Sequence, residues 1–277
     1  MKLLELQTKL LLKETQTDGH SPLVFICSDD NIYYCKYLPT IKKEEINCLA
    51  YEVVAHALLR KLAIPTPDIA LITIAEDTLN KKLIKNNKRL RVGDVCFGSK
   101  EIVYATEVQT IAQLNNKTEF NKLLNPDDII KIAIFDLWVN NVDRGRNFGE
   151  GYNYNLLLKP VGTKQEIMAF DHGFIFGGVN QIGIFNSKTN TLNSNKLYQS
   201  TYYKSVIKHI NKADYINIVN NFIPLLYENY DTLIKNIIEK LGANWDLSPK
   251  LDERIIAFLK TNEQIKEIKN IIIQAKK

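Results

Sequence analysis

Three oxygen-bearing side chains stand beside apolar runs in the middle of the chain. Asp143 follows the run "IAIFDLWVNNV", Asn155 precedes the strand-like "LLL", and Asp171 follows the strand-like "IMAF". Asn155 and Asp171 are 16 residues apart, which suits two antiparallel strands and a turn, so we expect all three side chains at one end of a hairpin. Phosphoryl transfer from ATP needs such a set: a carboxylate for the proton of the attacking hydroxyl, and a carboxylate and an amide oxygen to hold Mg²⁺.

The two aspartates are harder to explain as ordinary surface residues than their neighbours are. Asp143 and Asp171 each end a strongly apolar run, where an unpaired charge is costly unless a ligand, a metal or an arginine compensates it. Asn153 and Asn155, in contrast, are also residue types that simply form turns. His172, next to Asp171, is interpreted as a structural hydrogen-bonding residue rather than a general base.

The first part of the chain predicts a small sheet with one helix. "KLLLKE", "PLVFICS" and "NIYYCKYL" are short apolar runs separated by turn residues, which indicates an antiparallel meander. From Lys43 onward, apolar residues recur at helical spacing until Pro65 and Pro67 end the helix. "IALITIAE" then predicts a strand, and "VCFGSKEIVYATEV" a strand pair broken at Gly98.

The second part is predicted to be mostly helical. "NPDDIIKIAIFDLWVNN" offers Asn125 as an N-cap, Pro126 at the first helical position and two acids in the first turn. Its apolar residues cover nearly every face, which is typical of a helix buried in a core. After the expected hairpin comes a polar tract to about residue 200, and the remaining sequence has helical periodicity.

Composition excludes several classes of protein. No apolar run approaches the roughly 18 to 20 residues of a membrane span, and polar residues interrupt the N-terminus, so we expect a cytoplasmic protein without a signal peptide. The four cysteines form no C-x-x-C motif, which argues against a zinc site and a disulfide framework. The net charge of +5 is spread along the chain and indicates no extended nucleic-acid surface.

The central motif resembles a known family. The run N-x-D-R, then N-x-N-L-L-L, then D-H-G is similar to that of the HipA-like kinases, relatives of the protein kinases and the phosphatidylinositol kinases. The resemblance extends to "YYCKYLP", to "CLAYEVVAHALLRKLAIPTPDIALITI" and to "VCFGSKEIV", and so covers most of the chain. It implies an α+β, two-lobed protein kinase-like fold, with a small antiparallel sheet lobe and one helix in residues 1–106 and a larger helical lobe in residues 107–277.

The resemblance also implies roles for individual residues. Asp143 would be the catalytic base, and Asn155 and Asp171 would be the metal ligands. Lys36 would bind the phosphates of ATP while Glu52 holds its ammonium group, as the equivalent pair does in protein kinases. The cofactors implied are ATP and Mg²⁺.

The same resemblance implies roles for Arg144 and for the segment before the second strand. Arg144 would either neutralise charge on the transferred phosphate or tie the catalytic loop down. The segment "TDGHSP", with Gly19, His20 and Ser21, would cover the phosphates through backbone N–H groups, although it is not a G-x-G-x-x-G loop.

The catalytic loop departs from the family pattern by an insertion. Ten residues, "GRNFGEGYNY", separate Arg144 from Asn155 where family members have only a few. Either Asn155 is the metal ligand after this insertion, or Asn147 takes the role. We favour Asn155, because the amide should stand at the strand entrance opposite Asp171.

The function implied is transfer of the γ-phosphoryl group of ATP to a hydroxyl, with Ser or Thr of a protein as the acceptor. A pseudokinase that acts through partner contacts, and a kinase of lipids or small polyols, are the alternatives. An antitoxin-like or regulatory protein is the further partner that the resemblance implies. If the polar tract is regulatory, its candidate self-phosphorylation sites are Ser187, Thr189, Thr191 and Ser194.

Overall fold

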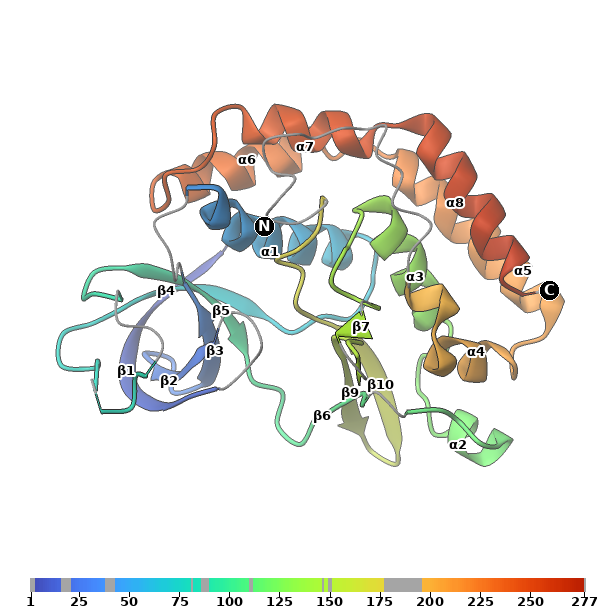
Figure 1. The fold of residues 1–277 in the computed structure, drawn as a ribbon, viewed down its shortest axis with the longest axis horizontal. Coiled ribbons are helices and arrows are strands. Elements are labelled where there is room, and N and C mark those ends of the chain that lie inside the picture. Colours follow the sequence, from blue (N-terminus) through green and yellow to red (C-terminus); the bar gives the residue numbers. More distant parts are fainter. Residues whose placement is uncertain are drawn as a thin grey trace.

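The structure is a computed structural model of the chain. It describes residues 3–15, 21–37, 43–80, 82–85, 90–109, 112–145, 147–148, 151–176 and 196–276, with the backbone alone at 43–45, 147, 148 and 151. Figure 1 shows a strand-rich N-terminal part and a helical C-terminal part, with a β-hairpin between them.

A closed barrel of five strands forms the N-terminal part. Its strands are β1 (Leu4–Glu14), β2 (Leu23–Cys27), β3 (Ile32–Lys36), β4 (Ile69–Thr73) and β5 (Val95–Lys100), in the order β1-β2-β3-β5-β4. Most neighbours are antiparallel, as expected, but β1 pairs with β4 in parallel. The expectation of a purely antiparallel sheet was therefore wrong. Two register shifts in β1 explain the closure, because such irregularities bend a strand, and the bent β1 reaches both β2 and β4.

The predicted break at Gly98 is also wrong, since Gly98 lies inside the continuous strand β5. A Cβ atom at this position would come within 2.2 Å of Ile72 Cδ1 on the neighbouring strand β4. Glycine is needed here for close packing and not for a turn. The chain leaves the barrel after Lys100 and forms β6 (Thr106–Glu107), which pairs with a strand of the hairpin instead.

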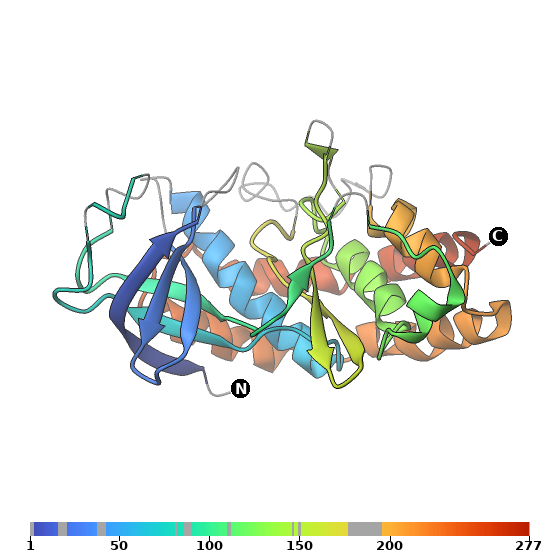
Figure 2. The ribbon, with the colours of Figure 1, turned by 90° about the horizontal axis from the view of Figure 1, so that it is seen from below.

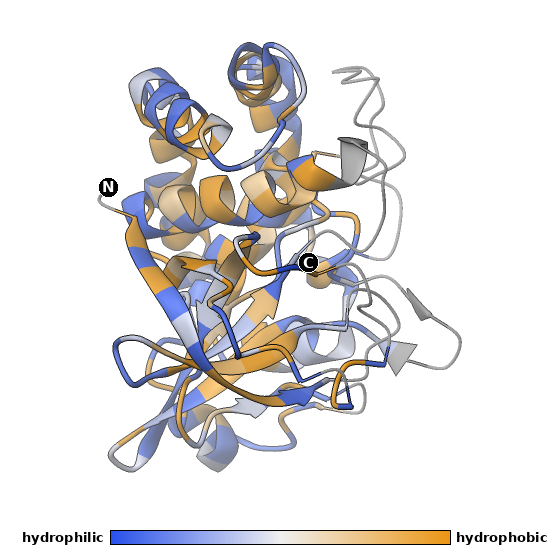
Figure 3. Cartoon of the chain, turned by 90° about the vertical axis from the view of Figure 1, so that its left-hand side faces the viewer, coloured by the Kyte–Doolittle hydropathy of each residue, from blue (hydrophilic) through white to orange (hydrophobic). Residues whose placement is uncertain are grey.

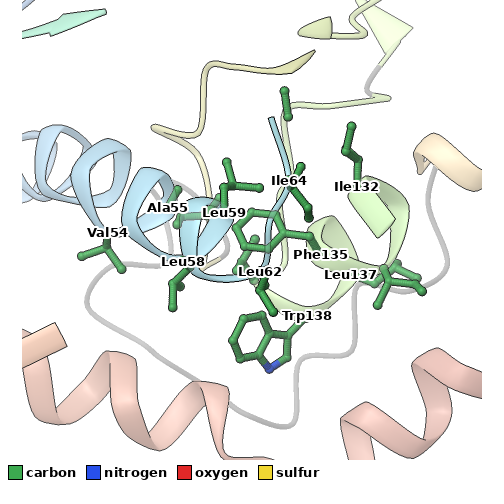
Figure 4. Close-up of a cluster of buried hydrophobic side chains, with 14 of the residues drawn as sticks. Val54, Ala55, Leu58, Leu59, Leu62, Ile64, Ile132, Phe135, Leu137 and Trp138 are labelled. Carbon is green, nitrogen blue, oxygen red and sulfur yellow. The ribbon is translucent and has the colours of Figure 1, made fainter. Parts of the chain in front are cut away.

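Helix α1 (Lys43–Lys61) follows β3 and is buried on almost every face. It lies between the barrel and the C-terminal helices α6 (Asp231–Gly242) and α7 (Leu251–Leu259). Its C-terminal half packs against α3 (Asp128–Trp138), where Leu59 and Leu62 approach Phe135 and Trp138 (Figure 4). Each large apolar side chain buried in this way contributes about 1.5–3 kcal/mol. This shared core fixes α1 relative to α3, the helix that leads to Asp143.

The helix α3 begins slightly later than predicted, at Asp128, and Asn125 does not cap it. Asn125 instead donates from Nδ2 to Asp128 Oδ2 at 2.6 Å and to the carbonyl of Ile167 at 2.9 Å. Its Oδ1 accepts the backbone N–H of Ile167 at 2.7 Å. The two hydrogen bonds to the backbone of Ile167 take the place of the predicted capping bond. Asn125 therefore fastens the start of α3 to the hairpin.

The hairpin consists of β9 (Leu156–Val161) and β10 (Lys164–Ala169), and a smaller pair, β7 (Asn147–Phe148) and β8 (Gly151–Tyr152), lies within the inserted residues. Figure 2 shows the β9–β10 hairpin between the barrel and α3. The other elements are α2 (Lys117–Asn121), η2 (Leu197–Gln199), α4 (Thr201–Ile207), α5 (Lys212–Phe222), η3 (Ile223–Tyr227) and α8 (Asn262–Gln274).

Hydrophobic and hydrophilic residues are interleaved along the strands and helices (Figure 3). The apolar side chains of the described residues gather in two cores, one inside the barrel and a larger one around α1 and α3. Helix α3 is buried on nearly every face, as predicted, and it has 11 residues. Among the described helices, none combines the length and the hydropathy that crossing a membrane requires.

Candidate active site

The end of the β9–β10 hairpin brings two of the predicted residues together. Leu156 pairs with Ala169, and just beyond this pair the N–H of Phe170 donates to the carbonyl of Asn155 at 3.1 Å. Asn155 and Asp171 therefore stand at the same end of the hairpin, as the spacing predicted. Both have left-handed backbone conformations, with φ of 45° and 57°. Such values are uncommon outside glycine and are often found at functional sites.

The loop that follows α3 brings Asp143 to the same place. Its Oδ2 accepts the side-chain amide N–H of Asn155 at 2.8 Å and that of Asn153 at 3.0 Å. Because the Nδ2 atom of Asn155 donates to Asp143, its Oδ1 is the atom left to act as a ligand. The predicted convergence of Asp143, Asn155 and Asp171 is a feature of the structure.

Lys36 reaches this group from the barrel side. Its Nζ lies 2.6 Å from Glu52 Oε1 and 2.6 Å from Asp171 Oδ1. Burial by itself would lower the pKa of Lys36, but the carboxylates of Asp171 and Glu52 outweigh it and raise the pKa. Lys36 therefore stays an ammonium group and links β3, α1 and the hairpin across the space between them.

Glu52 makes a second contact that ties α1 to the chain after Asp171. Its Oε2 accepts the backbone N–H of His172 at 2.7 Å, while Oε1 accepts from Lys36. Burial raises the pKa of Glu52 above its usual value, and Lys36 opposes this shift. His56, one turn further along α1, makes no pair with Glu52. Its side chain lines the same space, and burial lowers its pKa to about 4.

A cleft of about 850 Å³ lies between the barrel and the hairpin. Its volume is in the range of pockets for small ligands and cofactors. The lining includes residues of the barrel, of α1, of β6 and the connection 101–105 that precedes it, and of the loop that carries Asp143. The predicted residues among them are Lys36, Glu52, Asp143, Asn155 and Asp171.

The two aspartates of the cleft influence each other. Burial raises the pKa of Asp143, the charge of Asp171 raises it further, and the hydrogen bonds from Asn155 and Asn153 oppose the shift. Within the described ranges, no three Asp, Glu, His or Cys side chains are placed to hold a metal ion by themselves. The donor set offered is two carboxylates and one amide oxygen, which are hard ligands for a cation that keeps several of its waters.

Arg144 lies behind the cleft and not in it. It is 1% exposed, and its guanidinium group donates to several acceptors at once. The acceptors are Asp136 Oδ1 at 2.5 Å, the carbonyls of Tyr154 and Phe170 at 2.8 Å each, the carbonyl of Asn155 at 3.1 Å and His172 Nε2 at 3.2 Å. Of the two roles considered for Arg144, this geometry agrees with tying the loop down. Arg144 also holds His172 in a neutral, hydrogen-bonding role, because burial and the nearby guanidinium lower the pKa of His172.

Two residues of this scaffold were missed in the sequence. Asn141 Oδ1 accepts the backbone N–H groups of Asp143 at 3.1 Å and Arg144 at 3.3 Å, and its Nδ2 donates to Asp136 Oδ1 at 3.1 Å. Asn141 and Asp136 thus shape the turn that carries Asp143. The available signal was Asp136 itself, a charged residue inside an otherwise apolar helix, which needs a buried partner.

The remaining predicted residues lie beside the cleft, in the small β7–β8 pair, or outside the described part of the chain. Ser21 is buried, and its neighbour Pro22 lines the cleft. The carbonyl of Pro22 accepts a hydrogen bond from the backbone N–H of Thr15. The backbone of Asn147 pairs with Tyr152 in the small hairpin, but its side chain lies outside the described part of the chain. The other predicted residues that lie outside it are Gly19, His20, Ser187, Thr189, Thr191 and Ser194.

Comparison with known proteins agrees with this architecture. The family model of the HipA-like kinase matches residues 12–246. The crystal structure of the Helicobacter pylori proinflammatory kinase CtkA aligns with a TM-score of 0.51 and 15% identity, over 99% of this chain and 97% of that one. This likeness shows a kinase-like fold.

Two structures of the Golgi casein kinase, one with Mn/ADP bound, align with TM-scores of 0.49 and 0.46. Their identities are 12% and 14%, over 97% of this chain and 72% and 74% of theirs. No curated protein matches. Since the family match spans more than half of the sequence, the chain belongs to the HipA-like kinase family.

Proposed function

We propose that this protein is an ATP- and Mg²⁺-dependent kinase that transfers the γ-phosphoryl group to a Ser or Thr hydroxyl of a protein. One observation carries the proposal. Asp143, Asn155 and Asp171, which come from three separate stretches of the sequence, line one cleft opposite Lys36 of the barrel. Phosphoryl transfer depends mainly on positioning and on charge stabilisation, and these four groups supply both.

The donor set of the cleft fits a magnesium ion. Asp171 and the Oδ1 of Asn155 would hold it. Burial and, after it, the charge of Asp171 raise the pKa of Asp143, and a bound cation would oppose both effects. When bound, Mg²⁺ would neutralise the charge that develops on the phosphates during transfer. Asn155 is preferred to Asn147 in this role because its side chain is already bonded to Asp143 at the strand entrance.

Asp143 would act as the base. Its Oδ2 already accepts two amide N–H groups, so Oδ1 is the atom assigned to the hydroxyl of the acceptor. Burial, with the charge of Asp171, raises the pKa of Asp143 and so makes its carboxylate a better proton acceptor than an ordinary aspartate. The hydroxyl oxygen would attack the γ-phosphorus while its proton passes to this carboxylate, and the bond between the γ-phosphorus and the β–γ bridging oxygen would break so that ADP leaves.

Lys36 would bind the phosphates of the nucleotide, and its raised pKa keeps its ammonium group charged for that task. A lysine ammonium is a compact charge on a flexible stem, so it can turn from Asp171 to a phosphate while Glu52 retains it. Arg144 would act only by holding the backbone on which Asp143, Asn155 and Asp171 stand.

The test is transfer of label from [γ-³²P]ATP with Mg²⁺ present. The acceptors offered are the protein itself, myelin basic protein, phosphatidylinositol vesicles and glycerol. We expect label on Ser or Thr of a protein, and we expect Asp143→Asn to lower the rate about 10²- to 10⁴-fold, the contribution of a general base. Asp77→Asn, at an exposed turn outside the cleft lining, is the matched control and should label at the wild-type rate.

Each other outcome contradicts a stated part of the proposal. Label on the lipid or on glycerol alone would overturn the protein acceptor. Equal label with wild type and Asp143→Asn would remove Asp143 from the reaction. Binding of nucleotide without label on any acceptor would identify a pseudokinase.

A further inference from the structure

A lysine outside the cleft lining is buried in an unusual way. Lys196, at the start of η2, is only 4% exposed. Lysine is rarely buried unless it is paired with a carboxylate. Among the described residues, no carboxylate oxygen lies within 4.0 Å of its Nζ, which instead donates to the backbone carbonyl of Asn141 at 2.6 Å. Burial lowers the pKa of Lys196 to about 8, and the charge of Asp136 only partly opposes the shift.

The acceptor of this bond is the residue that shapes the catalytic loop. The side chain of Asn141 accepts hydrogen bonds from the backbone N–H groups of Asp143 and Arg144. The position of Asn141 therefore sets the backbone conformation that orients the side chain of Asp143. Lys196 contacts the same residue from its backbone side. Asn141 is thus held from both sides, by Asp136 through its amide and by Lys196 through its carbonyl.

The backbone of Lys196 is fixed as well. Its N–H donates to Gln199 Oε1 at 2.9 Å, and its carbonyl accepts the hydroxyl of Tyr152 at 2.9 Å. Tyr152 is a cleft residue of β8, inside the insertion that separates Arg144 from Asn155. Lys196 therefore joins three segments: the helical part that begins at η2, the inserted hairpin and the catalytic loop.

We propose that Lys196 is a positioning residue, which holds the catalytic loop through the carbonyl of Asn141 so that Asp143 faces the acceptor hydroxyl. This inference rests on the proposed kinase function. Stability alone does not account for a buried ammonium group without a carboxylate partner, because replacing a buried charge by an apolar side chain of similar volume is often neutral or stabilising. A residue that costs stability and touches a catalytic loop is expected where function requires it.

The test is Lys196→Met, which keeps the length of the side chain and removes the donor. Lys204→Met, at an exposed position of α4, is the matched control. Lys196→Gln restores a shorter neutral donor and serves as the conservative variant. For each protein, kcat, KM for ATP, the Kd for ADP with Mg²⁺ and the urea midpoint of unfolding are measured.

We expect Lys196→Met to lower kcat about 10- to 100-fold, on the scale that a misplacement near 1 Å produces. The Kd for ADP should change less than about 2-fold, because the bond lies outside the nucleotide site, and the urea midpoint should stay equal or rise. Lys196→Gln should recover part of kcat, and Lys204→Met should resemble the wild type.

Two results would overturn the inference while leaving the kinase function intact. One is an unchanged kcat in Lys196→Met. The other is a fall in kcat matched by a lower urea midpoint and by weaker ADP binding, since that pattern indicates a merely structural residue. A wild-type protein that binds ADP and transfers no phosphate would overturn the proposed function, and this inference with it.

Discussion

Two clusters of opposite charges flank the catalytic loop, one in front of it and one behind. In front, Lys36 bridges Glu52 and Asp171 at 2.6 Å each. Behind, Arg144 contacts Asp136 at 2.5 Å. In the front cluster, the side chains of Lys36 and Asp171 are 17% and 28% exposed and that of Glu52 is 4% exposed. In the rear cluster, those of Arg144 and Asp136 are 0% and 2% exposed.

We expect the exposure of Lys36 and Asp171 to separate the proposed active site from the buried cluster that supports it. Lys36 and Asp171 of the front cluster line the cleft, so a nucleotide bound as proposed would be able to replace one of the partners of Lys36. The rear cluster is closed by backbone carbonyls, and the planar guanidinium group of Arg144 is matched to them in a fixed geometry. Substitutions in front should therefore act on the reaction, and those behind should act on folding.

Arg144→Met should have the largest effect, and the effect should be on stability. Removing the guanidinium leaves Asp136 as an uncompensated buried charge, which typically costs about 3–5 kcal/mol. The measurement is the free energy of unfolding in urea. The control is the double variant Asp136→Leu/Arg144→Met, which should recover part of the loss because no charge then remains unpaired. A loss below about 1 kcal/mol in the single variant would show that the rear cluster is not the scaffold described.

Lys36→Met should show the opposite behaviour. We expect kcat/KM to fall about 10²- to 10³-fold, the usual effect of removing one group aimed at developing charge. The free energy of unfolding should fall less than in Arg144→Met, since Lys36 and Asp171 face a cleft that admits water and Glu52 is the one partner left buried. Lys13→Met, at an exposed position of β1, controls for the loss of charge. Equal losses of stability in Lys36→Met and Arg144→Met would erase the contrast between the clusters.

Glu52→Gln tests how much of the front cluster depends on charge. The amide oxygen can still accept the N–H of His172, but Lys36 loses one of its two anionic partners. A bond to a charged group is worth about 1 kcal/mol more than a neutral one, so kcat/KM should fall about 5- to 10-fold. Steady-state kinetics beside Glu253→Gln, an exposed control, measure the effect. Wild-type kinetics in Glu52→Gln would mean that Lys36 needs no anionic support.

The pH dependence should show the smallest effect. Asp143 must be ionised to accept a proton, and burial with the charge of Asp171 raises its pKa above 3.8. Activity should therefore be lost as the pH falls, with the half-maximal kcat/KM at a pH above that ordinary value. A pH profile of kcat/KM measures this midpoint. A midpoint at or below 3.8 would contradict the electrostatic account of the cleft.

The sequence predicted the parts of the site that depend on local spacing. Asn155 and Asp171 meet because two adjacent strands and a turn fix their register, and the order of polar and apolar residues shows such a hairpin. Lys36 and Glu52 were identified by the family resemblance, and their bonds to Asp171 and His172 span more than a hundred residues.

The features that were missed depend on contacts between distant segments. The parallel pairing of β1 with β4 joins residues more than sixty positions apart and leaves no periodicity in either strand. Lys196 bonds to Asn141 across 55 positions, and the sequence around it is an ordinary polar tract. Gly98 has the residue type of a turn, and only the neighbouring strand shows that it is needed for close packing.

The central claim is that Asp171 of the front cluster, together with Asn155, holds a divalent cation beside a nucleotide in the cleft. It is tested most directly by binding of Mn²⁺, as a probe for Mg²⁺, measured by electron paramagnetic resonance in the presence of ADP. The account predicts nucleotide-dependent binding of Mn²⁺ to the wild type and an affinity at least about 10-fold weaker in Asp171→Asn, with wild-type affinity in the exposed control Asp77→Asn. Equal affinity for Mn²⁺ in Asp171→Asn and the wild type would contradict it.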